Sequence, residues 1–125
     1  MHRSAFVLVL VPFLASTGCR HRNAAVQPFS ESVTVYVTNN YNQPMEVYVS
    51  ASGATHRLGS VNPGMEGRFQ IPHGLIGNGT VDFYAFPVAD ARQVARPGSL
   101  LLVRGQRVEF NIATPLFSST VTVRE

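Results

Sequence analysis

The amino-acid sequence predicts an all-β fold, a single antiparallel β-sandwich of about seven to eight strands. Apolar and polar residues alternate with a period of two through most of the chain after residue 31, which is typical of half-buried strands. Gly, Pro and Asn interrupt this alternation at intervals of about 8–12 residues, the spacing of short strands in sandwiches and barrels. No segment has a convincing helical period. The expected strands are 32–38, 45–50, 55–61, 65–71, 80–86, 99–103, 106–112 and 117–123.

Turn signals predict that most of the connections are hairpins. Ser52-Gly53 is a two-residue hairpin signal. Asn62-Pro63-Gly64 fits a type II turn, because Pro presets φ at the first corner and Gly accepts a positive φ at the second. Arg104-Gly105 predicts another hairpin, between 99–103 and 106–112. Immunoglobulin-like and transthyretin-like topologies both fit this pattern, and a small closed barrel is the rival architecture.

The segment 80–86 is the most aromatic of the expected strands and is apolar on both faces. Tyr84 and Phe86 point away from its main apolar row. This pattern predicts a strand at the centre of the sandwich or beneath a long loop. The segment 87–98 is expected to be that loop, with room for one helical turn over 89–96.

The charge balance argues against a nucleic-acid interface. The whole chain has a formal net charge of +3. From residue 29 onward, however, basic and acidic residues are equal in number, whereas binding to nucleic acid needs a clustered basic face. We therefore expect no nucleic-acid partner. The basic residues are Arg57, Arg68, Arg92, Arg96, Arg104, Arg107 and Arg124, and the acidic ones are Glu31, Glu46, Glu66, Asp82, Asp90, Glu109 and Glu125.

The sequence of the domain offers no pattern typical of a metal or catalytic site. His56 and His73 have no metal-ligating neighbour at short spacing, whereas zinc needs three or four N, S or O ligands. No serine stands in a G-x-S-x-G elbow, and a nucleophile needs a positioned base. We therefore expect a protein that is not an enzyme and that holds neither a metal nor a cofactor.

The sequence is compatible with more than one role for two acidic residues. Asp82 and Glu109 are either a facing acid pair or solubilising charges on exposed strand faces. For Asp82, the candidate partners across neighbouring strands are Arg104 and Arg107.

Three tyrosines form the candidate binding surface. Tyr36 and Tyr48 lie on the polar faces of strands expected to be consecutive, and residues opposite one another on paired strands interact. Tyr41 lies in the turn between them. Such a strip suits a peptide or a glycan. The alternative is that these rings merely cover the sheet beneath loops or the N-terminal segment.

The first nineteen residues have the layout of a secretory leader. The basic start Met1-His2-Arg3 precedes an apolar run over 5–14 and the small residues of 15–18, which end at Cys19, the one cysteine in the chain. The apolar run is shorter than the ~20 residues that a membrane-spanning helix needs. An ordinary cleaved signal peptide that leaves an unmodified thiol is one interpretation of this layout.

With its terminal cysteine, this segment resembles a bacterial lipoprotein leader, although Ser16 stands where the family usually has Leu. The resemblance implies a signal peptide over 1–18 and acylation of Cys19, the first residue of the mature protein. The polar segment 19–30 is then a flexible tether, and 31–125 is the β-sandwich domain. Arg20, where retained lipoproteins have Asp, implies the outer membrane, facing the periplasm.

The expectation is therefore a lipid-anchored, non-enzymatic protein of the cell envelope that serves as a binding or accessory module. Its partners would be the membrane, through Cys19, and another envelope protein or a glycan. The alternative is a small carrier of a ligand or glycan, or a hydrolase, with a pocket between the two sheets.

Overall fold

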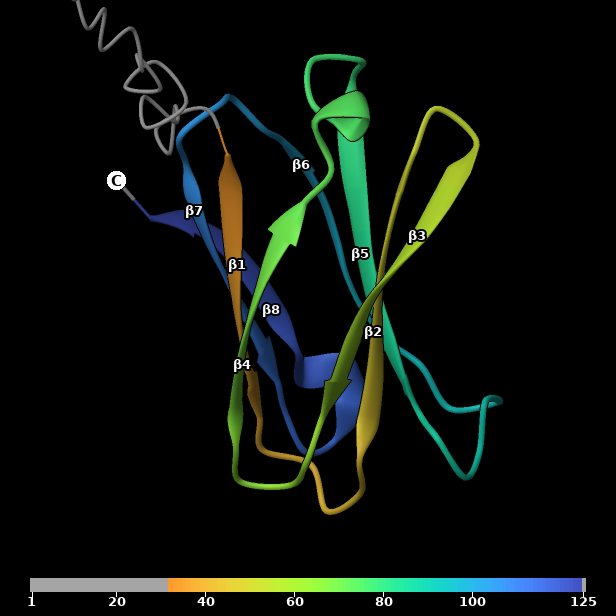
Figure 1. Cartoon of the computed structure of the whole chain (residues 1–125). Helices are drawn as coiled ribbons and strands as arrows, with labels where there is room; N and C mark the ends of the chain where they lie inside the picture. The colour runs from red at the N-terminus through yellow and green to blue at the C-terminus, as the bar shows by residue number, and fades with distance from the viewer. Residues whose placement is uncertain (1–31, 125) are drawn as a thin grey trace, which may run out of the picture.

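The computed structural model describes residues 32–124, which form two four-stranded sheets packed face to face (Figure 1). The all-β sandwich expected from the sequence is therefore confirmed. The predicted leader and tether, residues 1–30, lie outside the described residues. The strands are β1 (Val33–Asn39), β2 (Met45–Ala51), β3 (Ala54–Val61), β4 (Glu66–Ile71), β5 (Thr80–Pro87), β6 (Ala95–Leu101), β7 (Arg107–Ile112) and β8 (Thr120–Arg124), with short 3₁₀ turns η3 (His73–Leu75) and η4 (Leu116–Ser118).

The strands are divided between the sheets in the orders β4-β1-β7-β8, here sheet A, and β3-β2-β5-β6, here sheet B. Five of the six strand pairs are antiparallel, and β1 pairs with β7 in parallel. The aromatic strand β5 is internal to its sheet, as its two apolar faces predict. Four of the seven connections cross from one sheet to the other, so hairpins are fewer than the turn signals suggest.

The turns at the two ends of β3 are confirmed. Ser52 and Gly53 both have a positive φ, of 51° and 79°, which is the combination that a tight two-residue hairpin requires. At the other end, the amide of Met65 donates to the carbonyl of Asn62 at 3.0 Å, and Gly64 has a φ of 75°. This second turn reverses the chain but delivers it to the opposite sheet.

The predicted hairpin at Arg104-Gly105 is wrong, because β6 belongs to sheet B and β7 to sheet A. Gly105 does reverse the chain, with a φ of 86°. Just before it, however, the side chain of Leu102 is buried. Because this leucine is buried, the connection crosses the edge of the sandwich to sheet A instead of folding back along β6.

The segment 87–98 is also not wholly a loop, since β6 begins at Ala95, and none of 89–96 is helical. Pro97 lies inside β6 because β6 is an edge strand, where a missing backbone N–H is tolerated. The pairing with β5 is irregular at this point, and Gly98 has a φ of 131°. A Pro-Gly pair that resembles a turn thus forms a bulge. At the end of the chain, β8 is shorter than 117–123, because Leu116–Ser118 is the turn η4.

Side chains from both sheets fill the space between them. The Phe83 ring of sheet B meets the Phe110 ring of sheet A edge to face, with centroids 6.2 Å apart. The alternate valines Val33, Val35 and Val37 of β1 are fully buried around these rings. Burial of each such side chain contributes about 1.5–3 kcal/mol, and this apolar core is what holds the domain.

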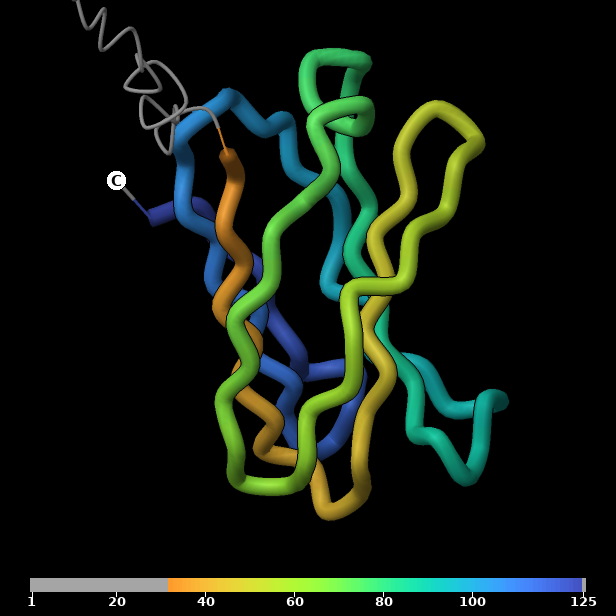
Figure 2. The backbone as a smooth tube through the Cα atoms, viewed as in Figure 1, coloured from red at the N-terminus to blue at the C-terminus, as the bar shows by residue number. Residues whose placement is uncertain are grey.

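The two ends of the sandwich are distinct (Figure 2). The first described residue, Ser32, and the end of β8 lie at one end, called here the N-terminal end, together with the β2–β3, β4–β5 and β6–β7 connections. The β1–β2, β3–β4, β5–β6 and β7–β8 connections lie at the opposite end.

Candidate functional site

The outer face of sheet A is polar throughout. In β1, Thr34, Tyr36 and Thr38 point outward, because Val33, Val35 and Val37 of the same strand are buried. Strand register places a polar side chain on each side of every one of them. From the N-terminal end, the rows across β4, β1, β7 and β8 are Gln70–Thr34–Arg107–Arg124, Arg68–Tyr36–Glu109–Thr122 and Glu66–Thr38–Asn111–Thr120.

A groove follows β1 along this face, and we call it the β1 groove. Apart from Tyr36, the outward side chains of β1 are short threonines, whereas β4 and β7 carry longer side chains on either side, so the middle strand forms the floor of the groove. Its larger part has a volume of about 480 Å³, and the part nearer the N-terminal end about 280 Å³. The two parts share Tyr36 and Arg107; the larger is also lined by Thr38, Asn40, Glu66, Glu109, Phe110, Asn111 and Arg124.

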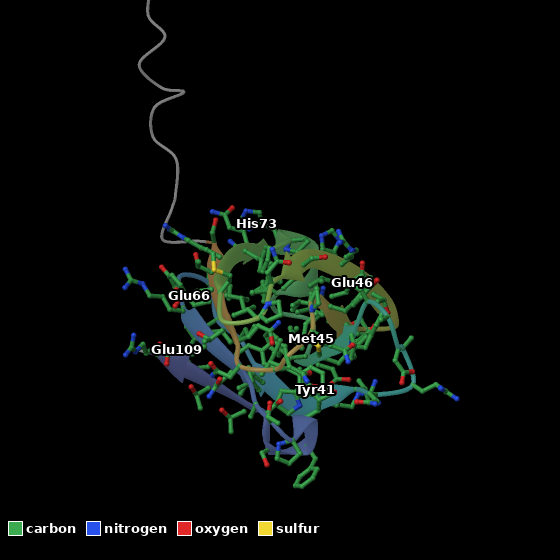
Figure 3. All side chains as sticks on the ribbon, turned by 90° about the horizontal axis from the view of Figure 1, so that it is seen from below. Tyr41, Met45, Glu46, Glu66, His73 and Glu109 are labelled. Atoms are coloured by element: carbon green, nitrogen blue, oxygen red, sulfur yellow. The ribbon has the colours of Figure 1, made fainter. Side chains whose placement is uncertain are left out.

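Charged groups surround the tyrosine of the groove. The guanidinium of Arg68 lies 5.7 Å from the centroid of the Tyr36 ring, a cation–π contact. On the other side, Arg124 Nη1 contacts Glu109 Oε1 at 2.9 Å. Figure 3 shows Glu66 and Glu109 on one side of the sandwich and Glu46 on the other. The groove thus offers an aromatic ring among donors and acceptors, an arrangement that can hold and orient a polar ligand.

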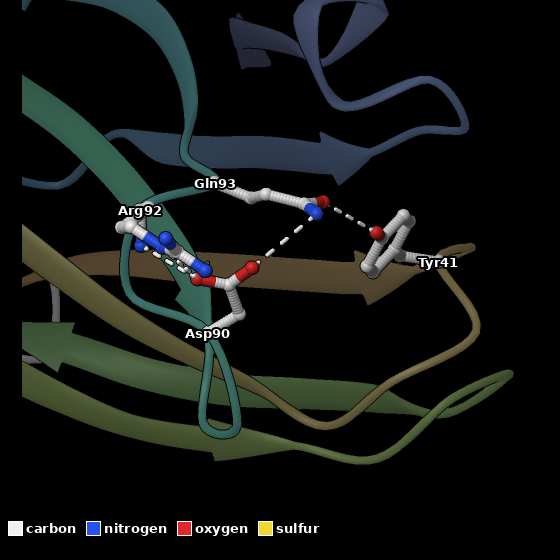
Figure 4. A network of polar contacts seen from close by, with 4 residues as sticks. All are labelled: Tyr41, Asp90, Arg92 and Gln93. Atoms are coloured by element: carbon white, nitrogen blue, oxygen red, sulfur yellow. Dashed lines mark hydrogen bonds and ion pairs between the residues drawn. The ribbon is translucent and has the colours of Figure 1, made fainter.

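The three predicted site tyrosines do not meet. Tyr36 lies on the outer face of sheet A, whereas Tyr48 lies on the outer face of sheet B. The prediction of cross-strand proximity was wrong because β1 and β2, although consecutive, belong to different sheets. Tyr41 is at the opposite end, where its hydroxyl donates to Gln93 Oε1 at 2.8 Å. Gln93 in turn donates to Asp90, so this network joins the β1–β2 and β5–β6 loops (Figure 4).

Tyr48 is instead the middle ring of an aromatic stack that the sequence pattern did not predict. Its ring is nearly parallel to Tyr84, at a centroid distance of 5.4 Å, and to Phe86, at 5.0 Å. Arg96 lies 5.3 Å from the centroid of Tyr84. The alternation in β5 did place Tyr84 and Phe86 outward, but only the β2–β5 register brings Tyr48 between them. Because these rings cover one another's faces, the stack offers little flat aromatic surface to a ligand.

The environment of Tyr48 affects its titration. Partial desolvation and then a hydrogen bond to Glu46, at 3.1 Å, raise the pKa of the Tyr48 hydroxyl above its ordinary value of 10.0, and the negative charge of Glu46 adds to this. Arg57 acts in the other direction, and it contacts Glu46 at 3.4 Å. This hydroxyl therefore holds its proton more tightly than an unperturbed tyrosine does, and it donates a hydrogen bond to the carboxylate of Glu46.

The remaining candidate residues are dispersed. Asp82 and Glu109 belong to different sheets and do not form an acid pair. Asp82 contacts Arg96 at 3.5 Å rather than the expected Arg104 or Arg107. Glu109 is the acid that pairs across strands, with Arg124.

Residues 32–124 offer neither a metal centre nor a membrane-spanning helix. No three His, Cys, Asp or Glu side chains in this range gather closely enough to hold a metal ion. None of its helical turns is long and apolar enough to cross a membrane.

Comparisons with known proteins give the fold and no more. No protein-family model matches the chain. The curated proteins contain no match to it either. Among solved structures it is similar to the NMR structure of a protein from Eubacterium rectale, with a TM-score of 0.51 and 14% sequence identity, over 79% of this chain and 94% of that chain. At this level of identity the likeness establishes a shared architecture.

Proposed function

We propose that the protein is a lipid-anchored, non-enzymatic module of the cell envelope that binds a polar partner in the β1 groove. The observation that carries the binding role is the groove itself, with Tyr36 on its floor between Arg68 and Glu109. Ligand sites are typically concave and combine an apolar or aromatic surface with a few convergent polar groups. Neither packing of the core nor pairing of the strands requires these side chains to line a groove.

A glycan is the partner class that suits this groove best, with an extended segment of another envelope protein as the second possibility. A sugar presents C–H groups to an aromatic face and hydroxyls to its surroundings. Tyr36 supplies such a ring, with Arg68 over one of its faces, and Glu66, Glu109 and Asn111 supply acceptors or donors around it.

Partner binding through strand addition has less support. Edge strands can accept a partner's strand. Of the four edge strands, both edges of sheet B carry features by which natural edges avoid such pairing: Pro97 and an irregular pairing in β6, and a register shift between β3 and β2.

The alternative of a carrier or hydrolase with a pocket between the sheets also has less support. Phe83 and Phe110 meet at the centre of that space, among fully buried valines. The β1 groove lies on the outside of the sandwich.

The proposed anchor rests on the leader. Two or more acyl chains hold a protein stably on a bilayer, because each buried methylene contributes about 0.8 kcal/mol. Replacing Cys19 by Ser in the full chain should block incorporation of labelled fatty acid and release the protein into the soluble fraction. Ser16→Leu, which restores the residue usual in the family, serves as the control that keeps both. A Cys19→Ser protein that is still labelled with fatty acid would contradict the anchor.

The groove is tested by site-specific photocrosslinking in native membranes. A crosslinker at Thr38, on the groove floor, should capture a reproducible partner, and one at exposed His56, on β3, should not. Adding Tyr36→Ala to the protein with the crosslinker at Thr38 should abolish the crosslinked product. Digestion of the product with a glycosidase or a protease then identifies its class. Equal capture from both positions, or capture that survives Tyr36→Ala, would refute the groove as the binding site.

A further inference from the structure

Three arginines lie close together at the N-terminal end of the sandwich. Arg104, Arg107 and Arg124 line one surface pocket of about 290 Å³, together with Gly105 and Gln106. Arg107 and Arg124 are directly opposite one another on β7 and β8. Like charges in such a pair destabilise a sheet. Glu109 pairs with Arg124 at 2.9 Å, and three guanidinium groups lining one surface pocket still concentrate positive charge, which suits an anion.

Two exposed apolar side chains lie where β6 ends and the β6–β7 connection begins. Leu101 and Val103 are 67% and 61% exposed, on either side of the buried Leu102. The Gln106 side chain accepts from the amide of Val103 at 2.8 Å, which fixes the connection next to the arginines. Exposed apolar residues beside basic ones are the combination that binds the interface of a membrane. The apolar residues enter the headgroup–acyl boundary, and the basic residues contact the lipid phosphates.

The cluster also lies where the described chain begins. Ser32 and Thr34 line the part of the β1 groove nearer this end, together with Gly105, Gln106 and Arg107. The Thr34 amide donates to the carbonyl of Gln106 at 3.2 Å. Cys19 is therefore thirteen positions along the chain from a residue at this end. Thirteen residues of any conformation reach at most about 45 Å, so an acylated Cys19 would keep this end of the domain near the bilayer.

Charge is distributed unequally between the two ends. Of the five described acidic residues, Glu46 and Glu66 lie at or next to the first residue of strands that start at the opposite end, and Asp90 lies in a loop there. The other two, Asp82 and Glu109, are the third residues of β5 and β7, which start at the N-terminal end. Glu31 and Glu125 lie outside the described residues. Among the described residues, the three arginines of the cluster outnumber the two acids near the N-terminal end, and this excess of positive charge favours a negatively charged surface there.

From these observations we propose that the N-terminal end of the domain docks on the bilayer, with Leu101 and Val103 at the headgroup–acyl boundary and the three arginines on the phosphates of anionic lipids. The inference rests on the proposed lipid anchor, which brings this end to the membrane. Docking orients the sandwich upright, so that the β1 groove runs away from the bilayer and the loops at the opposite end point outward.

Because Cys19 is the one cysteine of the chain, a new cysteine in the acylated protein provides a unique attachment point for an environment-sensitive fluorophore. We would reconstitute the full acylated protein in vesicles of phosphatidylcholine, with and without phosphatidylglycerol. The probe would be placed at Val103→Cys or, as the control at the opposite end, at the 87% exposed Phe117→Cys. The protein without a new cysteine is labelled in parallel.

The expected result is a blue shift at position 103 that requires phosphatidylglycerol, weakens in high salt and is absent at position 117. Adding Arg104→Gln should lower the docked-to-undocked ratio about fivefold, the equivalent of the ~1 kcal/mol that a basic residue contributes near an anionic surface. The matched variant Arg92→Gln, at the opposite end, should leave it unchanged. A water-like spectrum at 103 on anionic vesicles, or the same spectrum at both positions, would overturn the docking.

Two further outcomes distinguish membrane docking from the proposed lipid anchor and from the binding of a soluble phosphate ligand. Labelling of the protein without a new cysteine would contradict the anchor alone, and docking would then be decided by adding the same vesicles to the Cys19→Ser protein labelled at Val103→Cys. A spectral change at 103 with inorganic phosphate, in the absence of any change with anionic vesicles, would overturn docking in favour of a soluble phosphate ligand.

Discussion

Asn39, the last residue of β1, donates from its side-chain amide to the carbonyl of Val61, the last residue of β3 in the other sheet, at 2.9 Å. The same amide donates to the carbonyl of Gln43 at 2.8 Å, and Asn39 Oδ1 accepts from the amide of Tyr41 at 2.9 Å. Asn39 is fully buried. One side chain thus shapes the β1–β2 connection and joins it to β3, holding the two sheets together at this end.

Replacing Asn39 by Leu should therefore destabilise the domain severely. The substitution leaves the carbonyl of Val61 and the amide of Tyr41 without their side-chain partners, and an unsatisfied buried polar group costs about 1–3 kcal/mol. We expect a loss of roughly 3 kcal/mol in the free energy of unfolding, measured by urea denaturation. The neighbouring exposed Asn42→Leu should change it by less than about 0.5 kcal/mol. Equal losses for the two variants would contradict this role for Asn39.

Gly67 should not tolerate a side chain. A Cβ there would lie 2.8 Å from both the Phe69 ring and a methyl group of the buried Val61. Overpacking of this kind typically costs about 1–3 kcal/mol, and Gly67→Ala should lower the denaturation midpoint accordingly. Gly74→Ala is the matched control, because a Cβ at Gly74 meets nothing within 4 Å. The idea fails if the control is as unstable as Gly67→Ala.

Removal of one arginine of the N-terminal cluster should stabilise the protein in the absence of membrane. Arg107 opposes Arg124 across β7 and β8, so Arg107→Gln relieves repulsion and should add roughly 0.5 kcal/mol to the free energy of unfolding at low ionic strength. The gain should shrink as salt screens the charges. Arg92→Gln, which removes a 3.3 Å contact with Asp90, should give no gain. Destabilisation by Arg107→Gln would show that this arginine serves the fold.

Tyr48 should show a pH-dependent contribution to stability on the alkaline side. Its pKa in the folded state is raised above the ordinary 10.0, first by desolvation and then by the hydrogen bond to Glu46. The folded protein thus holds this proton more tightly than the unfolded chain. The resulting stabilisation is fully present below the unfolded pKa and is lost as the pH rises through the folded pKa.

Glu46→Gln should lower the pKa of Tyr48 toward its ordinary value, because it removes a nearby negative charge. Absorbance titration of tyrosinate, with Tyr48→Phe to assign the transition, measures this change. Glu66→Gln, on the outer face of the other sheet, is the control and should leave the Tyr48 transition in place. An unaltered transition in Glu46→Gln would show that Glu46 does not influence Tyr48.

The sequence by itself determined where most strands lie and which of their residues are buried. The side-chain period of a strand is two, so the pattern of β1 alone separates Val35, inside, from Tyr36, outside. Local chemistry likewise determined the hairpin at Ser52-Gly53. The predicted loop over 87–98 was wrong at its end, where Pro97 lies in β6, because Pro-Gly suits a turn and also a bulge on an edge strand.

Only the tertiary structure decided which sheet each strand joins, and with it the site. Alternation distinguishes the two faces of one strand but does not say which strand lies next to it. The reversals at 62–65 and at 102–106 deliver the chain to the opposite sheet, where a hairpin would keep it in the same one. Tyr36 and Tyr48 thereby face opposite ways, and Tyr36 lies in the β1 groove beside Arg68 and Glu109. Long-range burial of apolar side chains selects these pairings, and short sequence windows do not contain that information.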